Sequence, residues 1–222
     1  MKIAVVIPTL REAQQVESAI ASARGAEVEI LVVDGGSDDG TQALAESAGA
    51  RVLASGPGRA RQQALGYESS EAPVILLLHA DTRLPENWAS RVRETLADPE
   101  VSGGAFSFRF DQRSLRLAWI EWGVRIRLAL FRLPYGDQAI FARRSALAAL
   151  GGIPQAPIME DLDLVHALKS CGRFVLLDDS VRTSPRRYLR FGPLRTFWRN
   201  ARALVAWRLG IDRERVARWY HA

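Results

Sequence analysis

Two acidic side chains stand directly after hydrophobic segments that are typical of buried strands. Asp34 ends the segment VEILVVD, and Asp81 follows the segment LLLHA. A carboxylate at the tip of a core strand loses its hydration, which is costly unless a charged or hydrogen-bonding group meets it there. We therefore expect the strand end at Asp81 to face a charged partner.

A second acidic group lies far along the chain, in the segment PIMEDLDLVHALKSCGRF. It contains Glu160, Asp161 and Asp163, followed by the apolar spacing of an amphipathic helix. A carboxylate in a binding cleft can take a proton from a substrate hydroxyl. Acids in a first helical turn also commonly interact with the helix dipole. The residues alone leave both interpretations open.

The elements that must position these acids alternate regularly through the first hundred residues. Apolar, β-branched segments recur every 20–25 residues, and the stretches between them have helical spacing. The expected strands are KIAVVIP, VEILVVD, ARVLAS and APVILLLHAD; the expected helices cover 11–23, 41–48, 59–68 and 85–97. This alternation predicts an α/β fold with a mostly parallel sheet covered by helices on both faces. Ligands of such sheets bind at the carboxyl ends of the strands.

Several polar segments follow these strands and should therefore meet at one edge of the sheet. They are PTLRE, which includes Pro8, Thr9 and Glu12, then DGGSDDGT from Asp34, then SGPGRAR with Arg59 and Arg61, and finally His79 to Asp81. Turn formation and helix capping explain DGGSDDGT equally well when it is taken alone. Neither a GxGxxG nor a GxxxxGK[ST] phosphate-binding motif is present.

Length and composition indicate an ordinary globular protein. The 222 residues suit one large α/β domain, 1–222, and the single cysteine, Cys171, excludes an intrachain disulfide and favours a reducing compartment. No apolar stretch approaches the roughly 20 residues that a membrane span requires. The segment MKIAVVIPTL is typical of a strand and lacks the layout of a signal peptide. We expect a cytoplasmic protein.

The charge is distributed unevenly between the two halves. Residues 1–100 carry 9 basic and 15 acidic side chains, whereas residues 101–222 carry 21 basic and 10 acidic ones. Nearly all of the basic residues are arginine, which suits phosphate contacts and membrane interfaces, although codon bias would also produce it. The second half is therefore the part that is suited to an anionic surface.

Motifs along almost the whole chain resemble one enzyme family. VVIPTLRE, VVDGGSDDGT, the HAD of 79–81 and the MED of 159–161 are similar to family 2 glycosyltransferases of the GT-A fold. GPGRARQQALG, LLLHADTRLP, YGDQAIFARR, GGIP, PIMEDLDL and TSPRRY resemble a bacterial subfamily named rSAM/selenodomain-associated transferase 2. The resemblance implies transfer of a sugar from a nucleotide-diphosphate sugar, with inversion at the anomeric carbon.

For the first half, about 1–100, the resemblance implies a donor site. A UDP- or GDP-sugar would lie across the strand ends, and a divalent cation, Mn²⁺ or Mg²⁺, would be held at Asp81, which matches the aspartate of a DxD motif. The residues implied in nucleotide-sugar binding are Pro8, Thr9, Glu12, Asp34, Arg59, Arg61, His79, Asp81 and Arg187. The alternative for Asp81 is a helix N-cap ahead of Pro85.

For the second half, 101–222, the resemblance implies the acceptor side. Asp161 matches the family's catalytic base, and Asp137, Gln138 and Glu160 are implied to line the acceptor. The neighbouring charge of Glu160 should raise the pKa of Asp161 toward a value useful for a base.

The chain departs from the family pattern at the proposed metal site. His79 replaces the first acid of the DxD motif, and Arg83 stands where some relatives have a metal-coordinating polar residue. His79 is therefore either a metal ligand or a core histidine, and Arg83 is an alternative source of positive charge.

Two segments, 114–132 and 194–208, combine arginine with tryptophan. Their apolar stripes either pack on the sheet or lie on an anionic membrane, which would suit a lipid-like acceptor. A non-catalytic, membrane-associated nucleotide-sugar-binding module is thus an alternative function. A sugar-phosphate nucleotidylyltransferase is another, but it would normally carry a Gly-rich signature with a lysine near the first strand, and PTLREAQ has neither. No nucleic-acid partner is expected.

Overall fold

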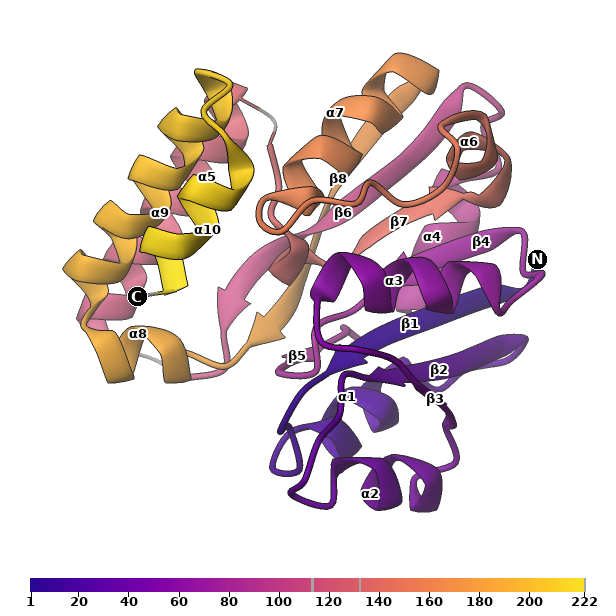
Figure 1. Cartoon of the computed structure of the whole chain (residues 1–222). Helices are drawn as coiled ribbons and strands as arrows, with labels where there is room; N and C mark the ends of the chain where they lie inside the picture. Colours follow the sequence, from indigo (N-terminus) through magenta and orange to yellow (C-terminus); the bar gives the residue numbers. More distant parts are fainter. Residues whose placement is uncertain (113, 132, 222) are drawn as a thin grey trace.

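The apolar segments of the first hundred residues form the parallel part of one sheet in the computed structural model, which describes residues 1–112, 114–131 and 133–221 (Figure 1). The strands are β1 (Ile3–Thr9), β2 (Val28–Asp34), β3 (Arg51–Ala54), β4 (Val74–Leu77), β5 (Thr82–Arg83), β6 (Val101–Phe110), β7 (Ile140–Arg143) and β8 (Arg173–Thr183). Within the described residues, the strands lie in the sheet in the order β3-β2-β1-β4-β7-β6-β8-β5. The pairs among β1 to β4 are parallel, as expected, and β7 enters antiparallel to both β4 and β6.

Helices cover both faces of this sheet. They are α1 (Val16–Ala23), α2 (Thr41–Ser47), α3 (Arg59–Glu68), α4 (Trp88–Thr95), α5 (Leu115–Phe131), α6 (Arg144–Ala149), α7 (Glu160–Cys171), α8 (Arg186–Phe191), α9 (Pro193–Arg208) and α10 (Arg213–His221), with a short 3₁₀ helix η1 (Gly136–Gln138). Alternate residues of β1 point to opposite faces, as the period of a strand requires. Ile3, Val5 and Ile7 pack with α1, α2 and α4, whereas Ala4 and Val6 pack with α3, α6 and α7.

Close packing of α3 on the sheet fixes the position of the loop that precedes it. A Cβ atom at Gly66 of α3 would lie 2.3 Å from a methyl group of Val6, so only glycine permits this approach of helix to strand. In the first turn of the same helix, the side-chain amide of Gln62 donates to the backbone carbonyls of Thr9 and Val33, each at 2.7 Å. The ends of β1 and β2 are thereby held together beneath the first turn of α3.

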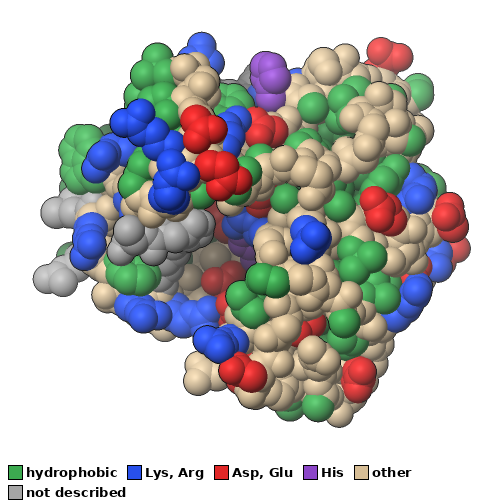
Figure 2. All heavy atoms as spheres, viewed as in Figure 1, with side chains coloured by type: hydrophobic (Ala, Val, Ile, Leu, Met, Phe, Trp, Pro, Cys, Tyr) green, Lys and Arg blue, Asp and Glu red, His purple; other side chains and the backbone are tan. Residues whose placement is uncertain are grey.

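The last three helices form a separate layer with α5, beside the carboxyl ends of the strands (Figure 1). Ile158, Met159 and Leu162, at the start of α7, pack against α9 and α10. Phe108 and Phe110, at the end of β6, pack against Leu117 and Ile120 of α5. The recess seen between this layer and the sheet in Figure 2 contains acidic, basic and histidine side chains.

Most expected elements are present, with differences at their ends. The helix expected over 59–68 coincides with α3, whereas the helix expected from Arg11 begins at Val16. Arg11 has a φ of 57°, so the backbone leaves β1 in a turn before a helix can start. Asp137 and Gln138 lie in η1, and β7 begins only at Ile140, after Ala139 with a φ of 48°.

Candidate active site

Asp34 ends β2 directly beside the end of β1. Thr9 and Asp34 are register partners, and the Thr9 hydroxyl donates to Oδ1 of Asp34 at 3.0 Å. The other donors to this carboxylate are the N–H of Gly36 (3.0 Å), the N–H and hydroxyl of Ser37 (2.7 and 2.5 Å) and the side-chain amide of Gln42 (2.8 Å). Burial opposes the charge, but the hydrogen bonds from Ser37, Gln42 and Gly36 outweigh it and lower the pKa of Asp34.

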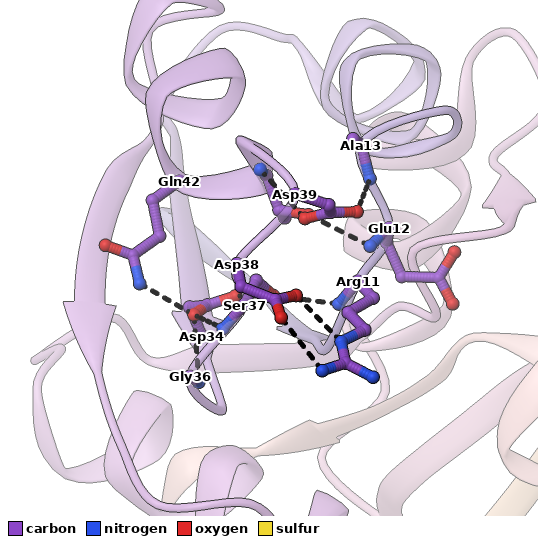
Figure 3. A network of polar contacts seen from close by, with 10 residues as sticks. Arg11, Glu12, Ala13, Asp34, Gly36, Ser37, Asp38, Asp39 and Gln42 are labelled. Atoms are coloured by element: carbon purple, nitrogen blue, oxygen red, sulfur yellow. Dashed lines mark hydrogen bonds and ion pairs between the residues drawn. The ribbon is translucent and has the colours of Figure 1, made fainter.

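The two other acids of the β2–α2 loop fasten this loop to the one after β1 (Figure 3). Arg11 makes a bidentate pair with Asp38, at 2.8 and 2.9 Å. Asp39 accepts from the hydroxyl of Thr41 at 2.5 Å and from the N–H of Ala13 at 3.1 Å. The N-cap of α2 is Gly40, with no side-chain cap hydrogen bond, so the acids of DGGSDDGT serve mainly to join two strand-end loops.

A cavity of about 610 Å³ lies between these strand ends and the C-terminal helices. Its walls come from the first turn of α3, the β4–β5 connection, η1, the start of α7 and the segments around α8, α9 and α10. Of the residues expected at the site, those that line this cavity are Arg59, Arg61, His79, Asp81, Asp137, Glu160 and Asp161.

Asp161 is held with its carboxylate oriented by backbone donors. The residue is 8% exposed, and its Oδ2 accepts the N–H of Gly136 at 2.7 Å while Oδ1 accepts the N–H of Leu162 at 2.9 Å. Burial and the neighbouring charge of Glu160 raise its pKa, against the opposing effects of Arg59 and the two backbone donors. A fixed carboxylate with a raised pKa, lining a cavity, has the properties of a general base.

Glu160 is buried beside Asp161 and is paired with Arg59. The two side chains join the first turn of α7 to the first turn of α3. Desolvation opposes the charge of Arg59, but the charges of Glu160 and Asp161 outweigh it and raise the pKa of the guanidinium. One cation thus lies against two adjacent carboxylates. Arg59 thus lines the cavity while it is paired with Glu160.

His79 and Asp81 line the same cavity from the β4–β5 connection. A Cβ atom at Gly136 would lie 2.7 Å from Nε2 of His79 and 3.3 Å from Oδ2 of Asp161. The imidazole and the carboxylate therefore flank a glycine that has no room for a side chain. The carbonyl of Asp81 accepts the N–H of Ser184 at 3.0 Å. The connection after β4 is thereby fixed to the segment after β8.

Glu12 extends away from the Asp34 loop toward the C-terminal part of the chain (Figure 3). Its two carboxylate oxygens each lie 2.9 Å from the Nη2 of Arg186. Burial and the negative charges of Asp81 and Asp39 raise the pKa of Glu12. The positive charge of Arg186 acts in the opposite direction and lowers it. Glu12 is thus paired with Arg186, which joins the loop after β1 to α8.

The far wall of the cavity comes from the last two helices, and sequence reasoning did not assign it. Asn200 of α9 and both Glu214 and Tyr220 of α10 line the cavity, and the Tyr220 hydroxyl donates to Asn200 at 2.8 Å. Tyr188 and Tyr135 line it as well. The only signal in the sequence was polar residues on helices that otherwise have an apolar stripe, which is too common a pattern to identify a site.

The remaining expected residues lie elsewhere. Pro8, Thr9, Glu12 and Asp34 gather at the ends of β1 and β2, next to the cavity rather than in its lining. Gln138 is fully buried; its amide donates to the carbonyl of Phe106 at 2.8 Å and its Oε1 accepts the N–H of Tyr135 at 3.2 Å, so it shapes η1 instead of facing an acceptor. Arg187 belongs to α8, and its side chain lies outside the described structure.

The sheet order, with a cavity at the carboxyl ends of its parallel strands, defines a single α/β domain of the GT-A class. A family model described as glycosyl transferase family 2 matches residues 4–147, and the chain belongs to this family.

Similar proteins agree with this assignment. The glycosyltransferase AglJ of Haloferax volcanii is 34% identical over 100 residues, which is 43% of this chain and only 33% of that protein. A structure of glucosyl-3-phosphoglycerate synthase from Mycobacterium tuberculosis with phosphoglyceric acid superposes with a TM-score of 0.68 at 23% identity, over 95% of this chain and 81% of that one. A second structure of that enzyme, with Mn²⁺, UDP and glucosyl-3-phosphoglycerate, gives a TM-score of 0.66 at 21% identity, with the same coverage of both chains.

Two absences hold for the described residues. None of their helices is long and apolar enough to cross a bilayer. No group of three or more histidine, cysteine, aspartate or glutamate side chains among them is arranged to hold a metal ion by itself.

Proposed function

We propose that this protein is an inverting glycosyltransferase that moves a sugar from a nucleotide-diphosphate sugar to a hydroxyl acceptor. The observation that carries the proposal is the carboxylate of Asp161, buried, oriented by two backbone N–H groups and lining a cavity that also contains His79 and Asp81. The family match favours this reaction over the nucleotidylyltransferase alternative.

The donor is proposed to lie with its base at the ends of β1 and β2 and its diphosphate near Asp81. An imidazole, His79, and a carboxylate, Asp81, line one cavity. This donor set fits Mn²⁺ or Mg²⁺, with phosphate oxygens and water as the remaining ligands. Solved structures of glucosyl-3-phosphoglycerate synthase contain Mn²⁺ or Mg²⁺ with UDP, which supports the same choice here.

The divalent cation would stabilise negative charge on the leaving diphosphate. The protein's own part is to position the acceptor and remove its proton. Asp161 takes the proton of the acceptor hydroxyl as that oxygen forms a bond with the anomeric carbon of the sugar. The bond between this carbon and the diphosphate oxygen breaks in the same step, so the nucleoside diphosphate leaves with the electron pair and the anomeric configuration inverts.

The acceptor is proposed to enter between η1 and the C-terminal helices. Asp137, Asn200 and Tyr220 line this part of the cavity and can hydrogen-bond to hydroxyl groups. Four further points stay predictions: a lipid-like acceptor, the subfamily, the cytoplasmic location, and the division into donor and acceptor halves.

Thermal denaturation with nucleotide sugars tests the donor assignment. A UDP- or GDP-sugar should raise the midpoint, and Mn²⁺ should increase that rise, because ligands that bind only the folded state stabilise it. Asp81→Asn should remove the increment that depends on Mn²⁺, whereas Asp178→Asn, a matched change at an exposed position of β8, should keep it. An increment that survives Asp81→Asn would show that the metal is bound elsewhere.

A further inference from the structure

The helix α5 carries an apolar stripe on its solvent-facing side. Leu115, Trp119, Trp122 and Ile126 follow one another at intervals of four, three and four residues, which places them along one side of a helix. All four are exposed; Leu115 is 86% and Trp119 is 71% accessible. The inner side of the same helix, with Leu117 and Ile120, is already buried against β6. The tryptophans of α5 are therefore not core residues.

The helix α9 repeats this arrangement with arginine added. Its exposed residues Arg195, Trp198, Arg202, Val205 and Leu209, the last directly after the helix, recur at intervals of three and four. Trp198 is 64% accessible, whereas Ala203 and Ala206 are buried on the inner side against α7 and α10.

The two stripes adjoin. A Cβ atom at Gly123, between Trp122 and Ile126, would lie 3.7 Å from the ring of Phe197, which precedes Trp198. Phe197 and Trp198 contact each other edge to face, as do Trp119 and Trp122. We call the combined surface the outer helical face; it comprises Leu115, Trp119, Trp122, Ile126, Phe197, Trp198, Val205 and Leu209. A contiguous exposed apolar surface of this kind marks an interaction site.

The charge around this face limits the kind of partner. Residues 184–222 contain ten arginines and two acidic residues, and α9 (Pro193–Arg208) contains four arginines and no acid. Basic and hydrophobic side chains lie next to each other over the helices at the left of Figure 2. A two-fold contact with a second copy would bring these arginines against themselves, which is unfavourable. A nucleic acid would use the arginines but gives no role to the exposed Leu115, Val205 and Leu209.

We propose that the outer helical face docks on an anionic lipid bilayer. Tryptophan, phenylalanine and leucine would enter the headgroup boundary while Arg195, Arg202 and Arg208 face the lipid phosphates, as in interfacial amphipathic helices. This inference does not depend on the proposed glycosyl transfer. It does place the cavity close to the membrane, because Asn200, on the inner side of α9, lines that cavity. A lipid-borne acceptor would then reach Asp161 from the bilayer.

Vesicle flotation of the full chain tests the docking. The protein should float with vesicles of phosphatidylglycerol and phosphatidylcholine in equal parts and remain behind with pure phosphatidylcholine. Binding should fall as salt rises, because salt screens exposed charges. The emission of the exposed tryptophans of the unaltered protein should shift to shorter wavelength on binding. Failure to float with the anionic vesicles at low salt would overturn the proposal, whatever the outcome of the donor experiment.

Paired variants assign the binding to this face. Arg195→Gln with Arg208→Gln should weaken partition by about fivefold per arginine removed, and Trp119→Ser with Trp198→Ser by about tenfold or more. Arg24→Gln with Arg51→Gln removes the same charge from exposed positions of the first half and should leave binding unchanged. Equal binding by all variants would overturn the assignment. A second result would also overturn the assignment. In it, the unaltered protein sediments as a dimer and does not bind vesicles, and the Trp119→Ser, Trp198→Ser double variant sediments as a monomer.

Discussion

Arg59 and Glu160 form an ion pair that joins the start of α3 to the start of α7 across 101 residues of sequence. Glu160 is nearly inaccessible to solvent and immediately precedes Asp161, so the charge balance of this pair acts directly on the carboxyl group proposed as the base.

Removing the charge of Glu160 should extend activity to lower pH. Asp161 must be ionised to accept a proton, so the rate falls as pH drops through its pKa, and the charge of Glu160 raises that pKa. In Glu160→Gln the pKa should decrease, and the acidic limb of kcat/KM should move down with it. The position of this limb is measured from initial rates against pH, with Asp178→Asn as the control that should not move it. If the acidic limb of kcat/KM stays at the same pH in Glu160→Gln, then a group other than Asp161 controls it.

Asp161→Asn should reduce transfer by about a thousandfold, because an amide cannot accept the proton of the acceptor hydroxyl. Donor binding, followed by the thermal midpoint with a nucleotide sugar and Mn²⁺, should be retained. Asp111→Asn, at an exposed position after β6, gives the matched loss of charge and should keep both properties. Full activity in Asp161→Asn would refute the assignment of the base.

Gly136→Ala should damage catalysis far more than folding. The new methyl group would lie 2.7 Å from Nε2 of His79, so either the imidazole or η1 must move, and the N–H that orients Asp161 moves with η1. We expect a fall in kcat of about a hundredfold and a loss of about 1–3 kcal/mol in the free energy of unfolding.

Gly123→Ala is the matched control for that change. A Cβ atom there has its nearest neighbour at 3.7 Å, and alanine favours the helix, so stability and kcat should be kept or rise slightly. If Gly136→Ala retains the kcat of the unaltered protein, the contact between η1 and the base does not matter for the reaction.

Asp163→Ala should loosen the C-terminal helices. One oxygen of Asp163 accepts both the indole N–H of Trp207 at 2.7 Å and a guanidinium N–H of Arg213 at 2.8 Å. The sequence offered an interaction with the helix dipole as one interpretation of this carboxylate, whereas in the structure it fastens α9 and α10 to α7. Urea unfolding should show a loss of about 2 kcal/mol, while Asp111→Ala should be near neutral. Equal stability of the two variants would contradict this role.

The parallel half of the fold was predictable because local pattern and final structure agree there. α3 runs over the expected residues. Most of the donors to Asp34, such as Ser37 and Gln42, lie within eight residues of it in the sequence. The element boundaries differ from the expected ones where a residue adopts a positive φ, as Arg11 and Ala139 do. The spacing of apolar residues does not predict such a turn.

The acceptor side was predictable only in part. Asp161 was identified from a motif, but Gln138, placed by the same reasoning, is enclosed by backbone partners as distant as Phe106. The wall formed by Asn200 and Tyr220 depends on how α9 and α10 pack on α7, which is decided by contacts between segments far apart in the chain. Such contacts leave no signature within any short window of sequence.

The proposed site is discontinuous in sequence, and this has a kinetic consequence. Its lining runs from Gly58 to Tyr220, so the cavity closes only after the final helix has docked on residues that were synthesised much earlier. Contacts of such long sequence separation form late, because loop closure must precede them. During refolding, helical circular dichroism should therefore recover before donor binding, and binding before catalytic turnover.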